Sequence, residues 1–216
     1  MPLSADGSLE LQYVSLMLDG ARLFAPLNLT VDAGEAATVM GPSGCGKSSL
    51  LALICGTLAP VFTAQGRVSL AGSPLDDLPP EARRVGILFQ DDLLFPHLSV
   101  GENLAFGLPP NIRGRNTRQD RIEAALEEAD LAGMADRDPA TLSGGQRTRV
   151  ALMRTLLSRP RALLLDEPFS KLDGELRDRI RHFVFEHASA NGIPTLLVTH
   201  DPADAEVASG QTIELR

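Results

Sequence analysis

The sequence contains no tryptophan, one tyrosine and two cysteines, and aromatic residues make up only 4% of its 216 positions. No apolar run approaches the roughly 18–20 residues that a membrane span requires, because "SLLALICG" and "ALLLD" are both short. The N-terminal "MPLSADGSLE" lacks the basic start and the apolar stretch of a secretory signal. We therefore expect a protein that stays in the cytosol and reaches a membrane only through a partner.

An excess of positive charge is also missing. The formal net charge is −8, which argues against general nucleic-acid binding, because that binding needs cations to displace counterions. The local exception, "RGRNTRQDR", is interpreted as a solvated surface in preference to a site for a polyanion or lipid headgroups. Cys45 and Cys55 are expected about 15 Å apart along one helix, too far for a disulfide, and so to be packing residues.

Strand-like and helix-like segments alternate along most of the chain, which predicts an α/β fold with a mostly parallel sheet. The N-terminal "LELQYVSLML" and "LFAPLNLTV" are expected to be strands, and "TRQDRIEAALEEADL" a helix with a capping-box-like start at Thr117 and Asp120. From Leu142 onward the expected order is helix, strand, helix, strand, helix and a short end strand. We predict a single domain over 1–216, with a nucleotide-binding core at 1–90 and 141–216 and a helical subdomain at 91–140.

"GPSGCGKS" matches the phosphate-binding pattern G-x-x-x-x-G-K-[ST] at every position, between an expected strand and an expected helix. The glycines let the backbone wrap a β-phosphate, Lys47 reaches the β and γ oxygens, and Ser48 offers a hydroxyl to Mg²⁺. This interpretation predicts a nucleotide hydrolase that uses Mg²⁺ and leaves the nucleotide open; ATP as the cofactor follows from the family resemblance given below. The predicted nucleotide-binding residues are Gly41, Pro42, Ser43, Gly44, Cys45, Gly46, Lys47, Ser48 and Ser49.

"ALLLD" places a carboxylate after four buried-type apolar residues, as expected at the carboxyl end of a parallel strand. Asp166 is therefore predicted to help bind Mg²⁺. Glu167 follows directly and is a candidate general base for the attacking water; capping of the next helix is the alternative role.

A second anion site is expected at "TLSGGQRTRVALMRTL", where glycines begin an apolar-periodic helix. The residues of this motif are Leu142, Ser143, Gly144, Gly145 and Gln146.

Together, "GPSGCGKS", "LSGGQ", "LLLDEP" and "VTHD" resemble the ATP-binding cassette (ABC) ATPases over nearly the whole chain. The sequence looks most like nucleotide-binding subunits of bacterial importers for iron, sulfate, molybdate, thiamine or polyamines. The resemblance implies the ABC ATPase fold, a P-loop NTPase core with an N-terminal antiparallel β-subdomain and a helical insertion. It also implies ATP hydrolysis that energises a membrane transporter.

The resemblance assigns further roles. Gln90 is similar to the glutamine that contacts Mg²⁺ and the attacking water, which makes Ser48, Gln90 and Asp166 the metal set. His200 resembles the switch histidine that binds the γ-phosphate and orders Glu167. Asp173 in "SKLD" resembles the aspartate that crosses the dimer interface.

The resemblance also implies partners. Two copies are expected to meet head to tail, with the LSGGQ segment of one closing over the ATP that the other binds. "DDLLFPHLSVGENL" resembles the segment that receives a helix of a transmembrane permease subunit. We also expect a solute-binding protein, a peripheral location on the cytoplasmic side of the inner membrane, and solubility in isolation.

Three alternatives remain open. The chain could be the ATPase subunit of an exporter, because exporters have the same type of ATPase domain. A soluble ABC protein of DNA repair or translation is disfavoured because no long coiled-coil insertion or tandem cassette is present. A GTPase is disfavoured because "SKLD" follows the magnesium strand too closely to be a guanine-reading motif.

One position departs from the family pattern. The family usually stacks adenine on an aromatic residue upstream of the P-loop, and counting back places Leu18 there, whereas Tyr13 lies too early. Losing the ring forfeits ~1 kcal/mol of aromatic contact. We therefore expect weak selection of the base. The transported solute is not encoded in this chain, because the ATPase does not touch it.

Overall fold

The computed structural model describes residues 7–215 of the chain. In this part of the chain the elements alternate much as the sequence predicts, in two compact units that interleave along the sequence. The first unit comprises residues up to Ile87 together with 161–167 and the segment from Arg181 onward; the second comprises 88–160 and 168–180. Each unit is described by itself below.

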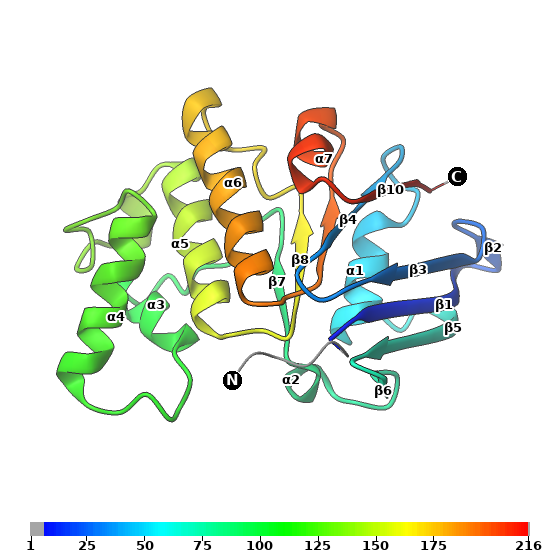
Figure 1. The fold of residues 1–216 in the computed structure, drawn as a ribbon, viewed down its shortest axis with the longest axis horizontal. Helices are drawn as coiled ribbons and strands as arrows, with labels where there is room; N and C mark the ends of the chain where they lie inside the picture. Colours follow the sequence, from blue (N-terminus) through cyan, green and yellow to red (C-terminus); the bar gives the residue numbers. More distant parts are fainter. Residues whose placement is uncertain (1–6, 216) are drawn as a thin grey trace. The chain divides into compact units, whose positions relative to one another are not determined.

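The first unit contains an antiparallel sheet near the N-terminus (Figure 1). In β3 buried and exposed residues alternate, as expected of a strand with one face on the core. The order is β2-β1-β5-β6, with β3 also paired to β1. The strands are β1 (Leu9–Leu18), β2 (Ala21–Arg22), β3 (Leu27–Val31), β5 (Phe62–Leu70) and β6 (Ser73–Pro74).

A β-bulge interrupts β1 at Tyr13, where the pairing with β3 and with β5 shifts register. Tyr13 has φ 52° and is 72% exposed, so its ring points away from the core. Across the bulge, a Cβ on Gly66 would lie 2.5 Å from the Tyr13 carbonyl oxygen, which only glycine avoids. Tyr13 therefore lies within the first strand, as the sequence predicts.

A parallel sheet forms the second layer, in the order β10-β4-β9-β8-β7. Every residue of β8 and β9 is buried, as is typical of central strands covered on both faces. β10, β4, β9 and β8 pair in parallel registers. The strands are β4 (Ala36–Met40), β7 (Val85–Leu88), β8 (Ala162–Asp166), β9 (Thr195–Val198) and β10 (Gln211–Glu214).

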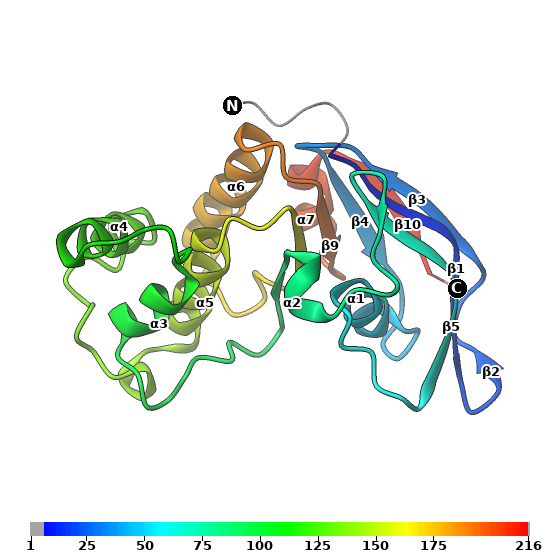
Figure 2. The same ribbon diagram turned by 90° about the horizontal axis from the view of Figure 1, so that it is seen from below.

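Helix α1 (Lys47–Cys55) shares one hydrophobic core with strands of both sheets (Figures 1 and 2). Its Leu50, Leu51 and Ile54 are fully buried among side chains of β1, β3, β4 and β9. Gly56 ends the helix in a left-handed conformation. The remaining helices of the first unit are α2 (Pro80–Arg83) and α7 (Pro202–Ala208), together with the later part of α6 (Gly174–Ala190).

The second unit is helical. It contains α3 (Val100–Gly107), α4 (Arg115–Glu128), a short 3₁₀ turn (Pro139–Thr141) and α5 (Gly144–Leu157). Ser99 and Glu102 form a capping box at the start of α3. The sequence predicts one apolar stripe of Ile122, Ala125, Leu126 and Ala129 for α4; the last three are buried, whereas Ile122 is only partly buried.

Two sequence-based boundaries are wrong. Helix α4 begins at Arg115 after Gly114, so Thr117 and Asp120 lie inside the helix and form no capping box. The Arg118 N–H already donates to the Gly114 carbonyl oxygen at 3.1 Å, so the helical hydrogen bonds begin before Thr117. The pattern of "RRVGILFQ" predicts a strand with Gln90 at its end, but β7 ends at Leu88, two residues earlier. Both cysteines are free, as predicted.

A buried arginine closes the carboxyl end of α1. Arg83 is 8% exposed, and its Nη1 donates to the carbonyl oxygens of Leu53 at 2.8 Å and Ile54 at 3.0 Å. Its Nε and Nη2 donate to the carbonyls of Leu78 and Asp76. A guanidinium at this position satisfies carbonyls that the helix leaves unpaired and complements the negative end of its dipole.

We predict that Arg83→Met lowers the free energy of unfolding by about 3 kcal/mol, because buried carbonyls lose charged donors. Urea unfolding followed by circular dichroism measures the change. Arg84→Met is the matched control, because the neighbouring Arg84 is exposed. Equal stability of the two variants would contradict this role for Arg83.

Candidate nucleotide site

The phosphate loop follows β4 and leads into α1, as predicted: residues 41–46 connect the two elements, and residues 47–49 begin the helix. Gly46 is the N-cap of α1 with φ 96° and no side-chain cap. A Cβ on Gly46 would lie 3.1 Å from the ring of Phe24, and one on Gly41 would lie 2.9 Å from Cys45 Sγ and from the Leu215 carbonyl oxygen. The loop thus needs glycine at both positions for its conformation and for its close packing.

Lys47 bridges the two ends of the loop. Its Nζ donates to the carbonyl oxygens of Gly41 at 2.7 Å and Pro42 at 2.8 Å. The ammonium therefore lies over the loop, where the uncapped N-terminus of α1 also favours negative charge. A Cβ on Gly44 would contact nothing within 4 Å, which leaves this side of the loop open to a ligand.

Asp166 ends β8 and is 8% exposed. Burial raises the pKa of its carboxyl group, and the neighbouring Glu167 raises it further; a hydrogen bond with the Ser48 side chain and the charge of Lys47 act in the opposite direction. The structure thus brings Ser48 and Asp166 together as two hard oxygen donors beside the phosphate loop, a donor set that fits Mg²⁺.

Glu167 contacts His200. The Glu167 Oε1 and His200 Nδ1 atoms lie 3.1 Å apart, and the two side chains are 22% and 69% exposed. Glu167 has φ 47°, a left-handed conformation that is uncommon for glutamate, and its N–H donates to the Val198 carbonyl at 2.9 Å. The pairing of a half-buried carboxylate with an exposed imidazole is suited to moving a proton at the carboxylate.

A buried ion pair supports the segment that carries His200. Arg181 Nη2 and Asp204 Oδ1 are 2.6 Å apart, and both side chains are about 5% exposed or less. The other Asp204 oxygen accepts from Thr199 Oγ1 at 2.7 Å, and Thr199 Oγ1 accepts from the Asp201 N–H at 3.0 Å. Residues on both sides of His200 are therefore held by one polar network.

In the second unit, "LSGGQ" begins α5 with a reciprocal capping box. Ser143 Oγ accepts from the Gln146 N–H at 3.3 Å, and Gln146 Oε1 accepts from the Ser143 N–H at 2.9 Å. Leu142 is buried beneath the turn. The cap uses the third N–H of the helix, so the N–H groups of Gly144 and Gly145 remain at its positive end.

The other predicted site residues of the second unit are exposed. Gln90 follows β7, and its carbonyl oxygen accepts from Lys171 Nζ at 2.7 Å. Asp173 precedes α6. The structure thus groups the phosphate loop with Asp166, and Glu167 with His200, in the first unit; Gln90, the LSGGQ segment and Asp173 belong to the second.

Several polar residues make contacts beside these sites that the spacing of residues in the sequence does not indicate. Arg181 and Asp204 are far apart in the sequence and look like ordinary surface charges of a helix. The N-cap pattern Asp201–Pro202 was the one available hint that "THDPAD" is an ordered turn. The missed residues are Arg181, Asp204, Thr199, Asp92 and Lys171.

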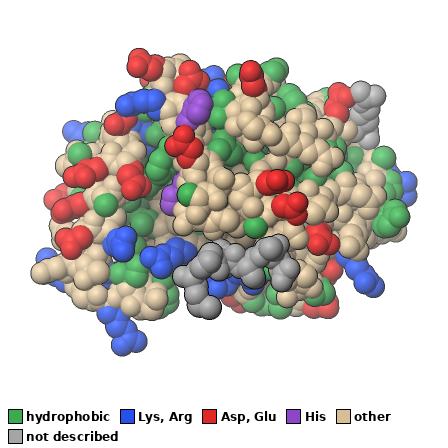
Figure 3. Space-filling view, in the orientation of Figure 1, with side chains coloured by type: hydrophobic (Ala, Val, Ile, Leu, Met, Phe, Trp, Pro, Cys, Tyr) green, Lys and Arg blue, Asp and Glu red, His purple; other side chains and the backbone are tan. Residues whose placement is uncertain are grey.

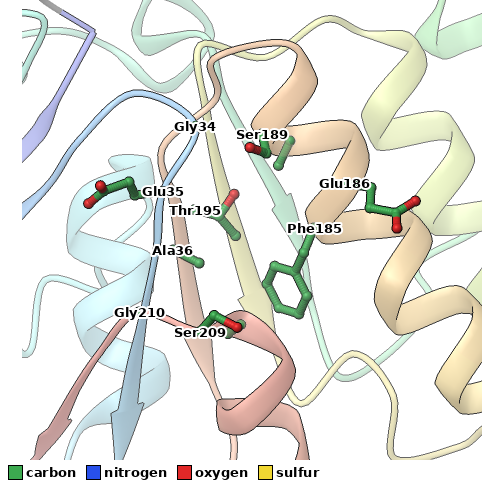
Figure 4. A pocket seen from close by; sticks show the side chains of 11 residues that line it. Gly34, Glu35, Ala36, Phe185, Glu186, Ser189, Thr195, Ser209 and Gly210 are labelled. Atoms are coloured by element: carbon green, nitrogen blue, oxygen red, sulfur yellow. The ribbon is translucent and has the colours of Figure 1, made fainter.

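A hollow of about 400 Å³ in the first unit is separate from the phosphate loop (Figure 4). Its lining includes Ala36 and Thr195, the first residues of β4 and β9, and Ser189 of α6. It therefore lies at the amino ends of these parallel strands, whereas the phosphate loop follows the carboxyl end of β4. Nucleotides bind at carboxyl ends in such sheets, so this hollow is not the nucleotide site.

A family model described as "ABC transporter" matches residues 24–170. The chain belongs to the ABC transporter family. The match contains the phosphate loop, the LSGGQ segment and the Asp166–Glu167 pair, so the chain is an ATP-binding domain of this family. The predicted resemblance to the ABC ATPases is confirmed.

Named ABC proteins are similar over most of this chain. An uncharacterized ABC transporter ATP-binding protein, YnjD of Escherichia coli, is 52% identical, with 90% of this chain and 91% of that protein covered. The thiamine import ATP-binding protein ThiQ of Cereibacter sphaeroides is 47% identical, with 85% and 78% covered. The spermidine/putrescine import ATP-binding protein PotA of Nitratidesulfovibrio vulgaris is 40% identical, and the match covers 96% of this chain but 56% of that protein.

A solved structure of the ABC family shares the fold. The ATP-binding cassette MJ0796, described as dimeric and bound to ADP and Pi in a post-hydrolysis state, superposes with a TM-score of 0.84 at 30% identity and covers 96% of this chain and 94% of its own. The predicted ABC ATPase fold, with its parallel core, antiparallel N-terminal sheet and helical insertion, is confirmed. Within residues 7–215, no helix is both long and apolar enough to span a bilayer.

The two signature glycines differ in their surroundings, which gives a stability prediction. A Cβ on Gly144 would come no closer than 3.9 Å to another atom, whereas one on Gly145 would lie 3.1 Å from the Lys171 carbonyl oxygen. We expect Gly144→Ala to raise the free energy of unfolding by about 0.5 kcal/mol, because alanine favours helix.

Gly145→Ala should show no such gain, since the Lys171 backbone must shift. Urea unfolding of the two variants side by side measures the difference. A more stable Gly145→Ala than Gly144→Ala protein would show that the close contact at Gly145 is unimportant.

Proposed function

We propose that this chain is the ATP-hydrolysing subunit of a membrane ABC transporter that imports a small solute or ion. The observation that carries the proposal is the convergence of Ser48 and Asp166 beside the phosphate loop, with Glu167 and His200 in contact. The importer direction is supported by the names of two similar proteins, which are import ATP-binding proteins for thiamine and for spermidine/putrescine. As a functional division we propose a nucleotide-binding core at 1–90 and 141–216 and a helical subdomain at 91–140, whereas the compact units described above group 141–160 and 168–180 with the helical part.

In the proposed site, Lys47 and the loop N–H groups bind the β and γ phosphates of ATP. Ser48 and Asp166 would hold Mg²⁺, with Gln90 as a further ligand when nucleotide is present, and the ion would neutralise charge on the phosphate oxygens. Glu167 accepts a proton from the attacking water, and His200 orients the Glu167 carboxylate and contacts the γ-phosphate. The left-handed backbone at Glu167 fixes the direction from which its carboxylate approaches.

A second copy of the chain is the proposed partner for catalysis. The signature motif starts a helix with the positive end of its dipole exposed, and the cassette that this chain resembles was solved as a dimer. We propose that Ser143, Gly144 and Gly145 of one copy contact the γ-phosphate bound by the other, with Asp173 at the same interface. Each copy would thereby complete the site of its partner.

A transmembrane permease subunit is the second proposed partner. Leu93 and Phe106 are 58% and 69% exposed, and the ring of Phe106 packs against Phe95 with centroids 4.7 Å apart. Arg154 lies over the Phe95 ring at 5.3 Å. Exposed apolar side chains of this kind fit a helix laid on the surface. The subunit would thus be peripheral, on the cytoplasmic side of the membrane, working with a solute-binding protein.

We propose no nucleic-acid partner. The net charge is −8, and acidic and basic side chains are interspersed on the face shown in Figure 3. Binding to a polyanion requires a continuous basic surface.

Glu167→Gln tests the catalytic assignment. The variant should bind ATP but turn over about 10²–10⁴ times more slowly, because the water loses its general base. Steady-state phosphate release measures the rate, and gel filtration with ATP and Mg²⁺ should show a trapped dimer. Normal turnover by Glu167→Gln would contradict the proposed role.

Two further variants test the binding sites for the phosphates. Lys47→Ala should lose nucleotide affinity, and Ser143→Arg should bind ATP yet remain monomeric.

The base of the nucleotide gives a second test. Leu18 is only partly buried and Tyr13 points out of the bulge, so neither supplies a packed ring at the position where this family usually has one. We expect ATP and GTP to bind with similar affinity in fluorescence titrations. Leu18→Trp should tighten the binding of ATP and of GTP by about fivefold each, the equivalent of ~1 kcal/mol of aromatic contact, because either purine can stack on the indole. A preference of about a hundredfold for ATP in the unmodified protein would contradict the expectation.

A further inference from the structure

Asp92 is a nearly buried carboxylate that binds the start of α5. Its side chain is 9% exposed. Asp92 Oδ1 accepts from Thr148 Oγ1 at 2.7 Å, and Asp92 Oδ2 accepts from Arg147 Nε at 3.2 Å. Thr148 and Arg147 follow the LSGGQ residues directly in α5. Asp92 therefore fixes the beginning of the signature helix to the segment that follows Gln90.

Lys171 links the same segment to "SKLD". Its Nζ donates to the Gln90 carbonyl oxygen at 2.7 Å and lies 4.0 Å from Asp92 Oδ2. It also lies 3.7 Å from Asp91 Oδ1, but Asp91 is 87% exposed, so that ion pair contributes little. The hydrogen bond to Gln90 and the shared Asp92 carboxylate are the contacts that matter.

The backbone of "SKLD" also packs directly on the signature helix. A Cβ on Gly145 would lie 3.1 Å from the Lys171 carbonyl oxygen and 3.3 Å from Leu172 Cδ2. Close packing of this kind transmits displacement instead of absorbing it. The segments 90–92, 143–148 and 170–173 therefore form one polar and steric assembly, which we call the Asp92 hub.

We infer that Asp92 and Lys171 are positioning residues that make the Gln90 segment, the LSGGQ helix start and the Asp173 segment move together. The inference rests on the proposed function, in which Gln90 responds to nucleotide and the other two segments meet the second copy. A shift at Gln90 passes through Lys171 to "SKLD" and through Asp92 to the first turn of α5. The hub would thus couple nucleotide state to the surface that closes on the partner.

If Asp92 and Lys171 only stabilised the fold, their removal would lower stability and would not act specifically on dimerisation. Apolar side chains after the first turns of α5 are buried around the helix and hold it without help from the hub; they are Val150, Ala151, Leu152, Met153 and Leu156. Lys171 itself is about one-third exposed. Its removal should therefore leave folding intact, and a defect specific to ATP-driven dimerisation would mark the positioning role.

The experiment uses the full chain with Glu167→Gln as parent, so that ATP-bound dimers accumulate. Lys171→Met and Asp92→Asn are added separately, and gel filtration is run over a series of ATP concentrations with Mg²⁺. Each should raise the ATP concentration for half-maximal dimerisation by about tenfold, as expected for one lost charged hydrogen bond. Lys171→Arg should stay near the parent, since it retains the charge.

Arg179→Met is the matched control. Arg179 is an exposed cation that pairs with Asp130 in the same unit but takes no part in the hub. It should dimerise like the parent. Affinity for a fluorescent ADP analogue, measured on the monomers, should be unchanged in every variant, because the phosphate loop is untouched. Combining Lys171→Met with Asp92→Asn should cost less than the sum of the two effects, because both break one network.

The outcomes separate the inference from the proposed function. If the Glu167→Gln parent stays monomeric with ATP, the proposed function is contradicted. The inference about the Asp92 hub, which rests on that function, is then overturned as well. If the parent dimerises and Lys171→Met and Asp92→Asn dimerise at the same ATP concentration, only the inference is overturned. A defect in Lys171→Met that Lys171→Arg does not show, with Arg179→Met normal, supports it.

Discussion

The carboxylate of Asp166 is the constraint on which the nucleotide site depends. It is delivered into a buried position by a strand whose every residue is inside the core, and burial raises its pKa. Among the described residues, a hydrogen bond with the Ser48 side chain and the charge of Lys47 act against that rise. The buried negative charge of Asp166 therefore depends on contacts from the phosphate loop. A divalent cation bound beside the loop would stabilise that charge further.

The sequence predicted the parts of the protein that repeat a local pattern. The phosphate loop, the glycine-led start of α5 and the alternation of strands and helices after Leu142 can each be recognised within a few residues, because they follow backbone geometry and hydrophobic periodicity. The fully buried runs of β8 and β9 were equally clear. These segments are also where the family resemblance lies, so fold and family could be predicted together.

What could not be predicted depends on contacts between distant side chains. Nothing in the spacing of Arg181 and Asp204 indicates that they meet in the core, and Asp92 looks like an ordinary loop aspartate until Thr148 is placed beside it. The predicted start of α4 is wrong because Thr117 is a residue type common at helix caps, whereas the helical hydrogen bonds already begin at the Gly114 carbonyl oxygen. Polar networks of this kind are a property of the tertiary structure, and only coordinates reveal them.

The last strand has a consequence for the phosphate loop. β10 pairs with β4 up to Met40, the Leu215 N–H donates to the Met40 carbonyl at 2.9 Å, and the Leu215 carbonyl faces Gly41. The end of the described chain thus packs against the start of the phosphate loop and supports it. Removal of β10 together with Leu215 would therefore take away the hydrogen bond to Met40 and the packing against Gly41, and would disturb the phosphate loop although no residue of the loop itself had changed.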